Sequence, residues 1–303
     1  MSSAAIDLAA ARRWLARTPA QAPWLHEEVA RRMAERLDII RLPVRQWAHW
    51  APAHSGLQGQ ARVAAHYPHA KCLAVCAQAG PMPQAPAEPA GWAQRWARLL
   101  PGGRQPAMAA APPAGAVQLV WANMLAHHVP QPADLLAAWH RALAVDGFVM
   151  FSCLGPDTLK ELRALYARLG WPPPAHALTD MHDWGDWLVA AGFAEPVMDM
   201  ETLVLTFETP ERLLAELREL GRNLHPLRFA GLRTPAWRRR LLAAMNESMR
   251  EPPGTGPLRL SFEIIYGHAL KPAPRHAVTG ETAISLADMR TSLKKGIRNF
   301  PPV

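Results

Sequence analysis

Near the middle of the sequence, residues 147–162 read GFVMFSCLGPDTLKEL. The apolar run at residues 148–154 follows an Asp-Gly turn signal and stops at Gly-Pro. A short run of bulky residues bounded by glycines is typical of a strand buried on both faces of a sheet. Asp157 is a residue type that often caps helices, so the stretch predicts a strand followed at once by a helix over residues 157–169.

A second buried strand is predicted upstream at residues 117–123, which read VQLVWAN. A predicted helix over residues 132–143 leads from it back to the central strand. Two parallel strands with such a crossover helix make an α/β sheet, whose ligands bind beyond the carboxyl ends of the strands. Asn123 and the turn at residues 154–157 lie at such ends. Asn123 is therefore a candidate binding residue, although a strand-end asparagine that only caps its loop fits the residues equally well.

The composition indicates a folded globular protein of one large domain or two small ones. Half of the 303 residues are hydrophobic and 19% are charged. No apolar run is long enough for a membrane span and no secretion signal opens the chain, so we expect a cytoplasmic, monomeric protein. The three cysteines form neither a disulfide framework nor a zinc set, and His127-His128 lacks a second ligand pair, so no metal is expected.

The net charge of +8 has two interpretations. One is an acidic partner, such as a nucleic acid or an acidic carrier protein. The other is a solvated surface in an arginine-rich composition. Because the arginines are scattered and only residues 238–240 form a run, the residues alone favour the second interpretation.

We expect three parts along the chain. N-terminal helices occupy residues 1–42, a main domain residues 43–271, and a flexible basic tail residues 272–303. Within the main domain, residues 77–116 are rich in proline and predict an irregular stretch. Residues 210–251 predict a pair of helices that could cover a pocket, the first of them with Thr209 as its cap and Pro210 at its first position.

Two periodic patterns predict how the ends of the main domain pack. A helix over residues 23–40 would bury one face, and residues 258–270 predict a strand with period-two alternation. A second long strand is predicted at residues 197–207. Because the helical pair joins these two strands, we expect them to form an antiparallel edge of the sheet. The apolar positions are Leu25, Val29, Met33, Leu37 and Ile40 in the helix, and Leu260, Phe262, Ile264 and Tyr266 in the strand.

Several segments together resemble the malonyl-acyl-carrier-protein O-methyltransferases of biotin synthesis, the BioC family. The resemblance covers about residues 25–42 and 117–271. The segments that carry it are LHEEVARRM at 25–33, LGPDTLKEL at 154–162, DMHDWGD at 180–186, AGFAEPVMD at 191–199 and EIIYGHA at 263–269.

The resemblance implies a class I methyltransferase, a Rossmann-like α/β fold with a seven-stranded, mostly parallel sheet whose last strand is antiparallel. It implies S-adenosylmethionine (AdoMet) as cofactor and the free carboxylate of malonyl on an acyl carrier protein as acceptor. That reaction is an in-line displacement, so positioning matters more than acid–base chemistry.

The resemblance also implies a substrate side with a positive group for the malonyl carboxylate. Arg218, Arg222 and Arg228 lie in the helical cover, although each also fits a solvated surface arginine. Leu154, Gly155, Asp157 and His182 belong to the matching segments and are further substrate-side candidates. His182 could donate to the carboxylate, or could be a structural histidine between two aspartates.

The chain departs from the family on the cofactor side. Residues 47–55 read WAHWAPAHS in place of a glycine-rich loop, Cys76 follows the second strand in place of a ribose-binding acid, and residues 108–113 contain no aspartate. Asn123 is the best-matched residue there. Two hypotheses therefore stay open: an AdoMet-dependent methyltransferase, or a methyltransferase-like pseudoenzyme that binds an acyl carrier or partner protein. Nucleic-acid methylation finds no supporting motif.

Overall fold

The computed structural model describes residues 6–16, 22–75, 107–109 and 111–274. The chain divides into two compact units, residues 1–272 and 273–303. The expected flexible tail and most of the expected irregular stretch lie outside the described residues, as does Cys76. The first unit holds the sheet and the candidate site.

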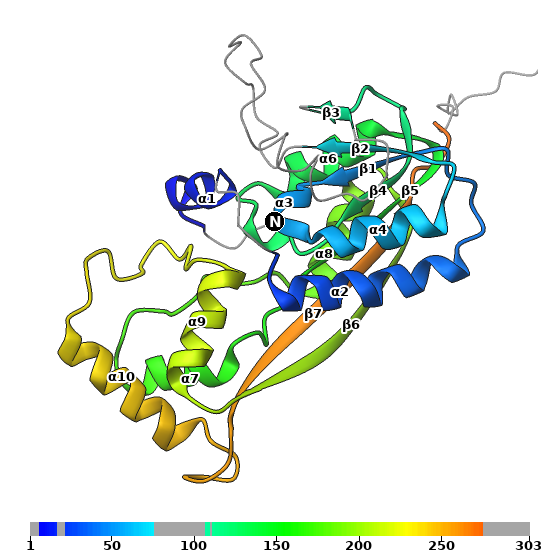
Figure 1. Ribbon diagram of the computed structural model, residues 1–303. Coiled ribbons are helices and arrows are strands. Elements are labelled where there is room, and N and C mark those ends of the chain that lie inside the picture. Colours follow the sequence, from blue (N-terminus) through cyan, green and yellow to red (C-terminus); the bar gives the residue numbers. More distant parts are fainter. Residues whose placement is uncertain (1–5, 17–21, 76–106, 110, 275–303) are drawn as a thin grey trace, which may run out of the picture. The chain divides into compact units, whose positions relative to one another are not determined.

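Within the described residues, seven strands form one sheet in the order β3-β2-β1-β4-β5-β7-β6 (Figure 1). β7 runs antiparallel to β5 and β6, and the other neighbouring pairs are parallel. This order with an antiparallel last strand is the class I methyltransferase fold, which confirms the expected fold class. The strands are β1 Gln46–Trp50, β2 Lys71–Val75, β3 Ala107–Ala109, β4 Val117–Ala122, β5 Leu143–Leu154, β6 Ala194–Phe207 and β7 Leu258–Leu270.

Helices pack on both faces of the sheet. α2 (Trp24–Glu35) and α4 (Leu57–His66) share one core with one face, and α6 (Pro132–Ala142) and α8 (Met181–Ala190) share another core with the opposite face. β5 contributes to both cores, because Phe148 and Met150 face the first and Val149 and Phe151 face the second. The central strand is thus buried on both faces, as its sequence predicts.

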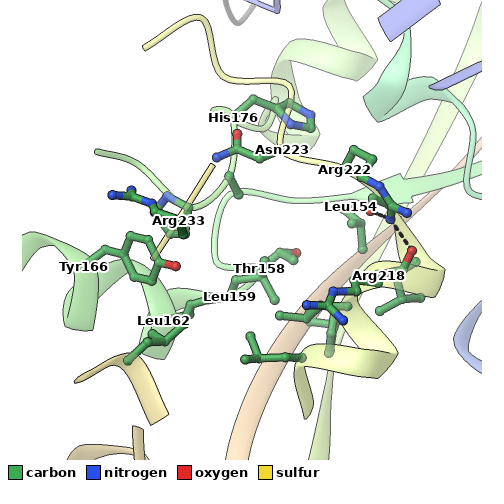
Figure 2. Close-up of a pocket in the computed structure, with 18 of the residues that line it drawn as sticks. Leu154, Thr158, Leu159, Leu162, Tyr166, His176, Arg218, Arg222, Asn223 and Arg233 are labelled. Atoms are coloured by element: carbon green, nitrogen blue, oxygen red, sulfur yellow. Dashed lines mark hydrogen bonds between the residues drawn. The ribbon is translucent and has the colours of Figure 1, made fainter. Parts of the chain in front are cut away.

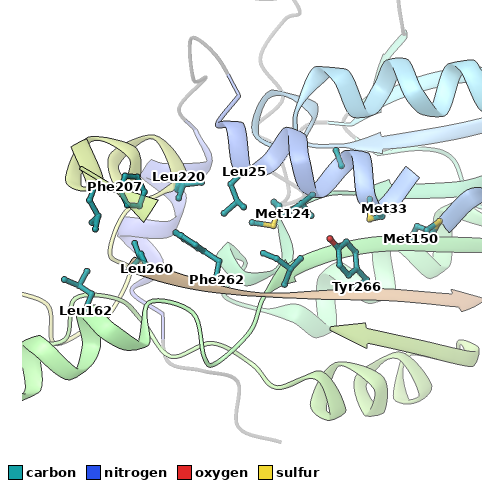
Figure 3. Close-up of a cluster of buried hydrophobic side chains, with 14 of the residues drawn as sticks. Leu25, Met33, Met124, Met150, Leu162, Phe207, Leu220, Leu260, Phe262 and Tyr266 are labelled. Atoms are coloured by element: carbon teal, nitrogen blue, oxygen red, sulfur yellow. The ribbon is translucent and has the colours of Figure 1, made fainter. Parts of the chain in front are cut away.

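The first core confirms both periodic patterns (Figure 3). Leu25, Val29, Met33 and Leu37 are fully buried, and Ile40 packs against them. Alternate residues of β7 point into the same core, because successive side chains of a strand face opposite sides. These are Leu260, Phe262, Ile264 and Tyr266.

β6 and β7 extend past the other strands and meet the helical cover (Figure 1). The cover consists of α9 (Pro210–Leu220) and α10 (Pro235–Ser248), and α7 (Lys160–Arg168) packs against α10. Each cover helix begins with proline in its first turn after a threonine whose hydroxyl accepts a backbone N–H, at Thr209 and Thr234. The predicted Thr209 cap is confirmed.

Two local predictions were wrong. α7 begins at Lys160, and Asp157 does not cap it. The reason is tertiary: the Asp157 N–H donates to the buried Glu263 carboxylate of β7, which holds residues 156–159 in a turn. β3 lies inside the stretch expected to be irregular, where it pairs with β2. Three residues are too short a signal to predict a strand without that partner.

Four short helical elements complete the described part of the first unit. α1 (Leu8–Leu15) begins at Asp7, whose side chain accepts from the Ala10 N–H. A single helical turn, α3 (Pro52–Ser55), follows β1. η1 (Arg36–Ile39) continues α2, and η2 (Ala126–His128) follows β4.

Candidate functional site

A cavity of about 620 Å³ lies between the carboxyl end of β5 and the helical cover (Figure 2). Its floor includes Leu154 at the end of β5, and Thr158 and Leu159 from the turn that follows. α7 adds Leu162 and Tyr166. This volume is within the usual range for small-molecule sites, roughly 300–1,000 Å³.

The floor is fixed by hydrogen bonds to β7. The Gly155 N–H donates to the Glu263 carbonyl at 2.9 Å, and the Asp157 N–H donates to the Glu263 carboxylate at 2.6 Å. The Leu159 N–H donates to the Ser261 carbonyl at 2.7 Å. Glu263 is 6% exposed, so the floor is held by a buried carboxylate.

The cavity combines apolar walls with positive charge. α9 contributes Leu214, Leu217 and Leu220, and the start of α10 contributes Trp237. The basic side chains are Arg218, Arg222, Arg233 and Arg238, and no aspartate or glutamate is among the described residues that line the cavity. A low-dielectric cleft with charge of one sign attracts ligands of the opposite sign. The cavity therefore suits an anionic group on an apolar or flexible carrier.

The structure brings three of the seven substrate-side candidates to this cavity, namely Leu154, Arg218 and Arg222. Of the others, His182 is turned to solvent, with 85% of its side chain exposed, and bonds to Asp180 at the start of α8. The Asp157 side chain is 69% exposed and lies 3.8 Å from Lys160. Arg228, the third arginine of the cover, instead pairs with Asp7 at 2.7 Å.

Gly155 supports the floor without lining the cavity. A Cβ atom at this position would lie 2.7 Å from the Glu263 carboxylate, so any side chain here would require Glu263 to move. Glycine therefore allows the turn to approach β7 closely enough for the hydrogen bonds that hold it.

Asn123, the cofactor-side candidate, is fully buried at the end of β4. Its amide nitrogen donates to the carbonyls of His26 at 2.8 Å and Ser55 at 2.5 Å, and its oxygen accepts from Ser152 at 2.7 Å. Asn123 thus joins α2, α3 and β5 through one side chain. These bonds use both its donors and its acceptor within the chain.

The carboxyl end of β1 is also closed by the chain itself. The Ser55 hydroxyl bonds to the carbonyls of Trp50 and Ala51 at 2.9 and 2.7 Å. Over this turn lies Trp14 of α1, whose ring centre is 6.0 Å from that of His54 and 5.7 Å from that of His128. α1 is therefore packed over the ends of β1 and β4.

Buried histidines surround this region, and burial keeps them neutral. Desolvation lowers the pKa of His26 to about 4, although its bond to the His54 carbonyl opposes the shift. Burial likewise lowers the pKa values of His127 and His128 well below their ordinary range, with repulsion among the histidines as a further cause. The pKa of His176 is lowered by burial as well. Protonation of these side chains would place charge in a desolvated layer.

The described residues do not by themselves complete a site for AdoMet. At the ends of β1 and β4, the side chains of Ser55 and Asn123 bond within the chain. The segment after β2, where the family resemblance implies a ribose-binding acid, lies outside the described residues.

Several lining residues escaped the sequence patterns. Tyr166, His176, Arg233 and Trp237 reach the cavity from different elements. The sequence does show Trp237 next to the arginine run at 238–240, which was a usable signal for a binding surface. No sequence pattern, however, places this cluster beside β5.

No described helix is long and apolar enough to cross a membrane. No group of three or more metal-ligating side chains is placed to hold a metal ion in the part of the chain that the structure describes.

The sequence is similar to those of several curated proteins. No family model matches the sequence. A malonyl-[acyl-carrier protein] O-methyltransferase from Gallionella capsiferriformans is 39% identical over 258 residues, covering 83% of this chain and 85% of the relative. One from Laribacter hongkongensis is 37% identical, covering 83% and 84%. The solved structure of the Bacillus YcgJ protein aligns with a TM-score of 0.49 at 13% identity, over 80% of this chain and 98% of that one. The identity to the curated relatives, over most of both chains, shows that this chain belongs to the malonyl-[acyl-carrier protein] O-methyltransferase family.

Proposed function

We propose that the protein transfers a methyl group from AdoMet to the free carboxylate of a malonyl group carried by an acyl carrier protein, a step of biotin synthesis. The observation that carries the proposal is the arginine-lined cavity at the end of β5, in a chain 39% identical to a relative named for this reaction. The cavity offers positive charge for the carboxylate and apolar walls for the rest of the acyl chain.

For this reaction the cavity must hold and orient the acceptor carboxylate. A carboxylic acid with an ordinary pKa near 4 is already ionised at neutral pH, so no base is needed. AdoMet supplies the methyl group. Arg218 lies in the last turn of α9 and Arg222 follows the end of that helix. Both line the cavity, where guanidinium groups can hold a carboxylate through charge-assisted hydrogen bonds. The leucines of α9 exclude water around the acyl group.

The fixed floor supports this role. Because Gly155, Asp157, Thr158 and Leu159 are hydrogen-bonded to Glu263 or Ser261 of β7, the acceptor would rest on a surface that does not adjust freely. A small misplacement of reacting atoms is costly in rate, so a rigid floor favours transfer.

The test is a methylation assay with purified malonyl-acyl-carrier protein and AdoMet. We expect S-adenosylhomocysteine to form and the acyl group to gain one methyl by mass spectrometry. Acetyl-acyl-carrier protein is the matched control, because it has the same thioester and no free carboxylate. Absence of product with the malonyl form, together with no heat of AdoMet binding at millimolar concentration, would overturn the proposal.

The alternative of carrier binding without catalysis is not favoured, because the curated relatives are named as O-methyltransferases. The same assay separates the two functions: the alternative predicts carrier binding without formation of S-adenosylhomocysteine.

A further inference from the structure

A basic, partly apolar surface adjoins the mouth of the cavity. Residues 221–240 contain six arginines and no aspartate or glutamate. They form the connection from α9 to α10 and the first turns of α10. We name this segment the arginine rim.

The arginine rim also exposes large apolar side chains. Leu227 is 73% exposed, Phe229 46% and Leu232 98%. They alternate along the chain with Arg228 and Arg233. Exposed apolar groups gathered among charges of one sign are typical of a protein-binding surface, because a bound partner can remove them from water.

Stacking on aromatic rings holds two of the arginines in place. The Arg233 guanidinium lies 3.7 Å from the centre of the Phe229 ring and 4.4 Å from that of Trp237. Arg240 lies 5.5 Å from the centre of the Trp171 ring, which itself packs against Trp237 at 5.0 Å. A stacked guanidinium loses less freedom on binding and keeps N–H groups at its edge for carboxylates.

Most of this charge is not neutralised by the chain. Among the described residues, no carboxylate lies within ion-pair distance of Arg233, Arg238, Arg239 or Arg240, whereas Arg228 pairs with Asp7. The rim is also continuous with the cavity, because three of its arginines, Arg222, Arg233 and Arg238, line the cavity. A partner seated on the rim would therefore stand beside the cavity mouth.

We infer that the arginine rim is the docking surface for the acyl carrier protein, which binds through acidic side chains and seats apolar groups against Leu227, Phe229 and Leu232. The inference rests on the proposed function for the identity of the partner. A carrier docked there can pass its acyl group, on a flexible arm, directly into the cavity. Recognition of the protein by residues 227–240 of the rim thus involves other residues than recognition of the carboxylate by Arg218 and Arg222.

The apolar residues distinguish this partner from a nucleic acid. Nucleic-acid interfaces are strongly polar and positively charged. Leu232, almost fully exposed, would meet phosphate and sugar there, but it can bury against an apolar patch on a protein.

The test measures binding of fluorescently labelled malonyl-acyl-carrier protein by anisotropy, without AdoMet, at several salt concentrations. Arg239→Glu/Arg240→Glu is expected to raise the dissociation constant about tenfold or more and to flatten its salt dependence. Leu232→Ser is expected to raise it several-fold with the salt dependence unchanged. All three positions are exposed, so the fold should persist.

Arg45→Glu/Lys71→Glu is the matched control, because it makes the same change in net charge at exposed positions near the amino ends of β1 and β2. Equal weakening by both double variants would overturn the inference, as would tight binding of a single-stranded oligonucleotide to the rim with none of the carrier. Normal methyl transfer with unchanged carrier affinity in the rim variants would remove the docking surface and keep the proposed function. Rim-dependent binding of the carrier without methyl transfer would keep the docking surface and overturn the proposed function.

Discussion

Two regions at the carboxyl edge of the sheet differ in how they use their polar groups. At the ends of β1 and β4, Asn123 and Ser55 bond inward, and α1 packs over them. At the end of β5, the chain leaves a cavity of about 620 Å³ lined by four arginines with no acidic neighbour among its described lining residues. We call these the closed end and the cavity end.

The difference indicates that the closed end stabilises the fold and that the cavity end binds ligand. A buried polar group that loses its partner costs more than the bond contributed, so the closed end should be sensitive to substitution and to pH. The rim of the cavity end is exposed and should tolerate substitution, at the expense of ligand affinity. Each prediction below tests this division.

The largest expected effect is acid destabilisation of the closed end. His26 and His49 have folded pKa values of about 4, below the ordinary 6.5, because both are buried. A depressed pKa means that the unfolded chain binds more protons, so stability is full above pH 6.5 and falls as the pH drops toward 4. Each shift corresponds to about 3 kcal/mol at the low end of this window. Urea unfolding at pH 8, 7, 6 and 5 measures the loss.

His182→Gln is the control for the pH series, because that imidazole is 85% exposed. Its pH profile should match that of the unchanged protein. A stability that stays constant from pH 8 to pH 5 would contradict the burial of the histidines.

Asn123→Ala should destabilise the protein by roughly 2–4 kcal/mol, because it removes the buried hydrogen bonds of this amide to His26, Ser55 and Ser152. Denaturant unfolding measures the change. Asn246→Ala serves as control, since that amide only accepts from Arg250 on a half-buried helix face and should cost less than about 1 kcal/mol. Equal losses of unfolding free energy in the two variants would contradict the stabilising role of the closed end.

Gly155→Ala should cost roughly 1–3 kcal/mol and lower the rate of methyl transfer, because the added Cβ would collide with the Glu263 carboxylate and shift the cavity floor. Gly185→Ala is the matched control: the nearest atom to its Cβ would be 3.6 Å away, and alanine favours a helix. A stable, fully active Gly155→Ala variant would show that the floor is not held as described.

The smallest effect on stability should come from Arg218→Ala at the exposed mouth of the cavity. We expect a change within about 0.5 kcal/mol in unfolding free energy and a KM for malonyl-acyl-carrier protein raised roughly tenfold, because a carboxylate contact is lost. Steady-state kinetics and urea unfolding together check this. An unchanged KM would exclude Arg218 from carboxylate binding.

Local sequence patterns predicted the scaffold because they report burial. The alternation in residues 258–270 matches β7, and the spacing of Leu25, Val29 and Met33 matches α2, since in each case one face must leave water. Thr209 and Pro210 marked the start of α9 because capping acts within one turn. The start of α7 was mispredicted for the opposite reason: Glu263, over 100 residues away, holds Asp157.

By itself, the sequence determined the strands and helices, their buried faces, and kinship with the carboxyl methyltransferases through its matching segments. Only the tertiary structure decided that Leu154, Arg218 and Arg222 share one cavity while Asp157 and His182 face solvent, and that Asn123 bonds inward. The physical reason is range. Hydrophobic periodicity and capping act between neighbours along the chain, whereas a cavity and a buried hydrogen bond depend on distances between residues that only folding brings together.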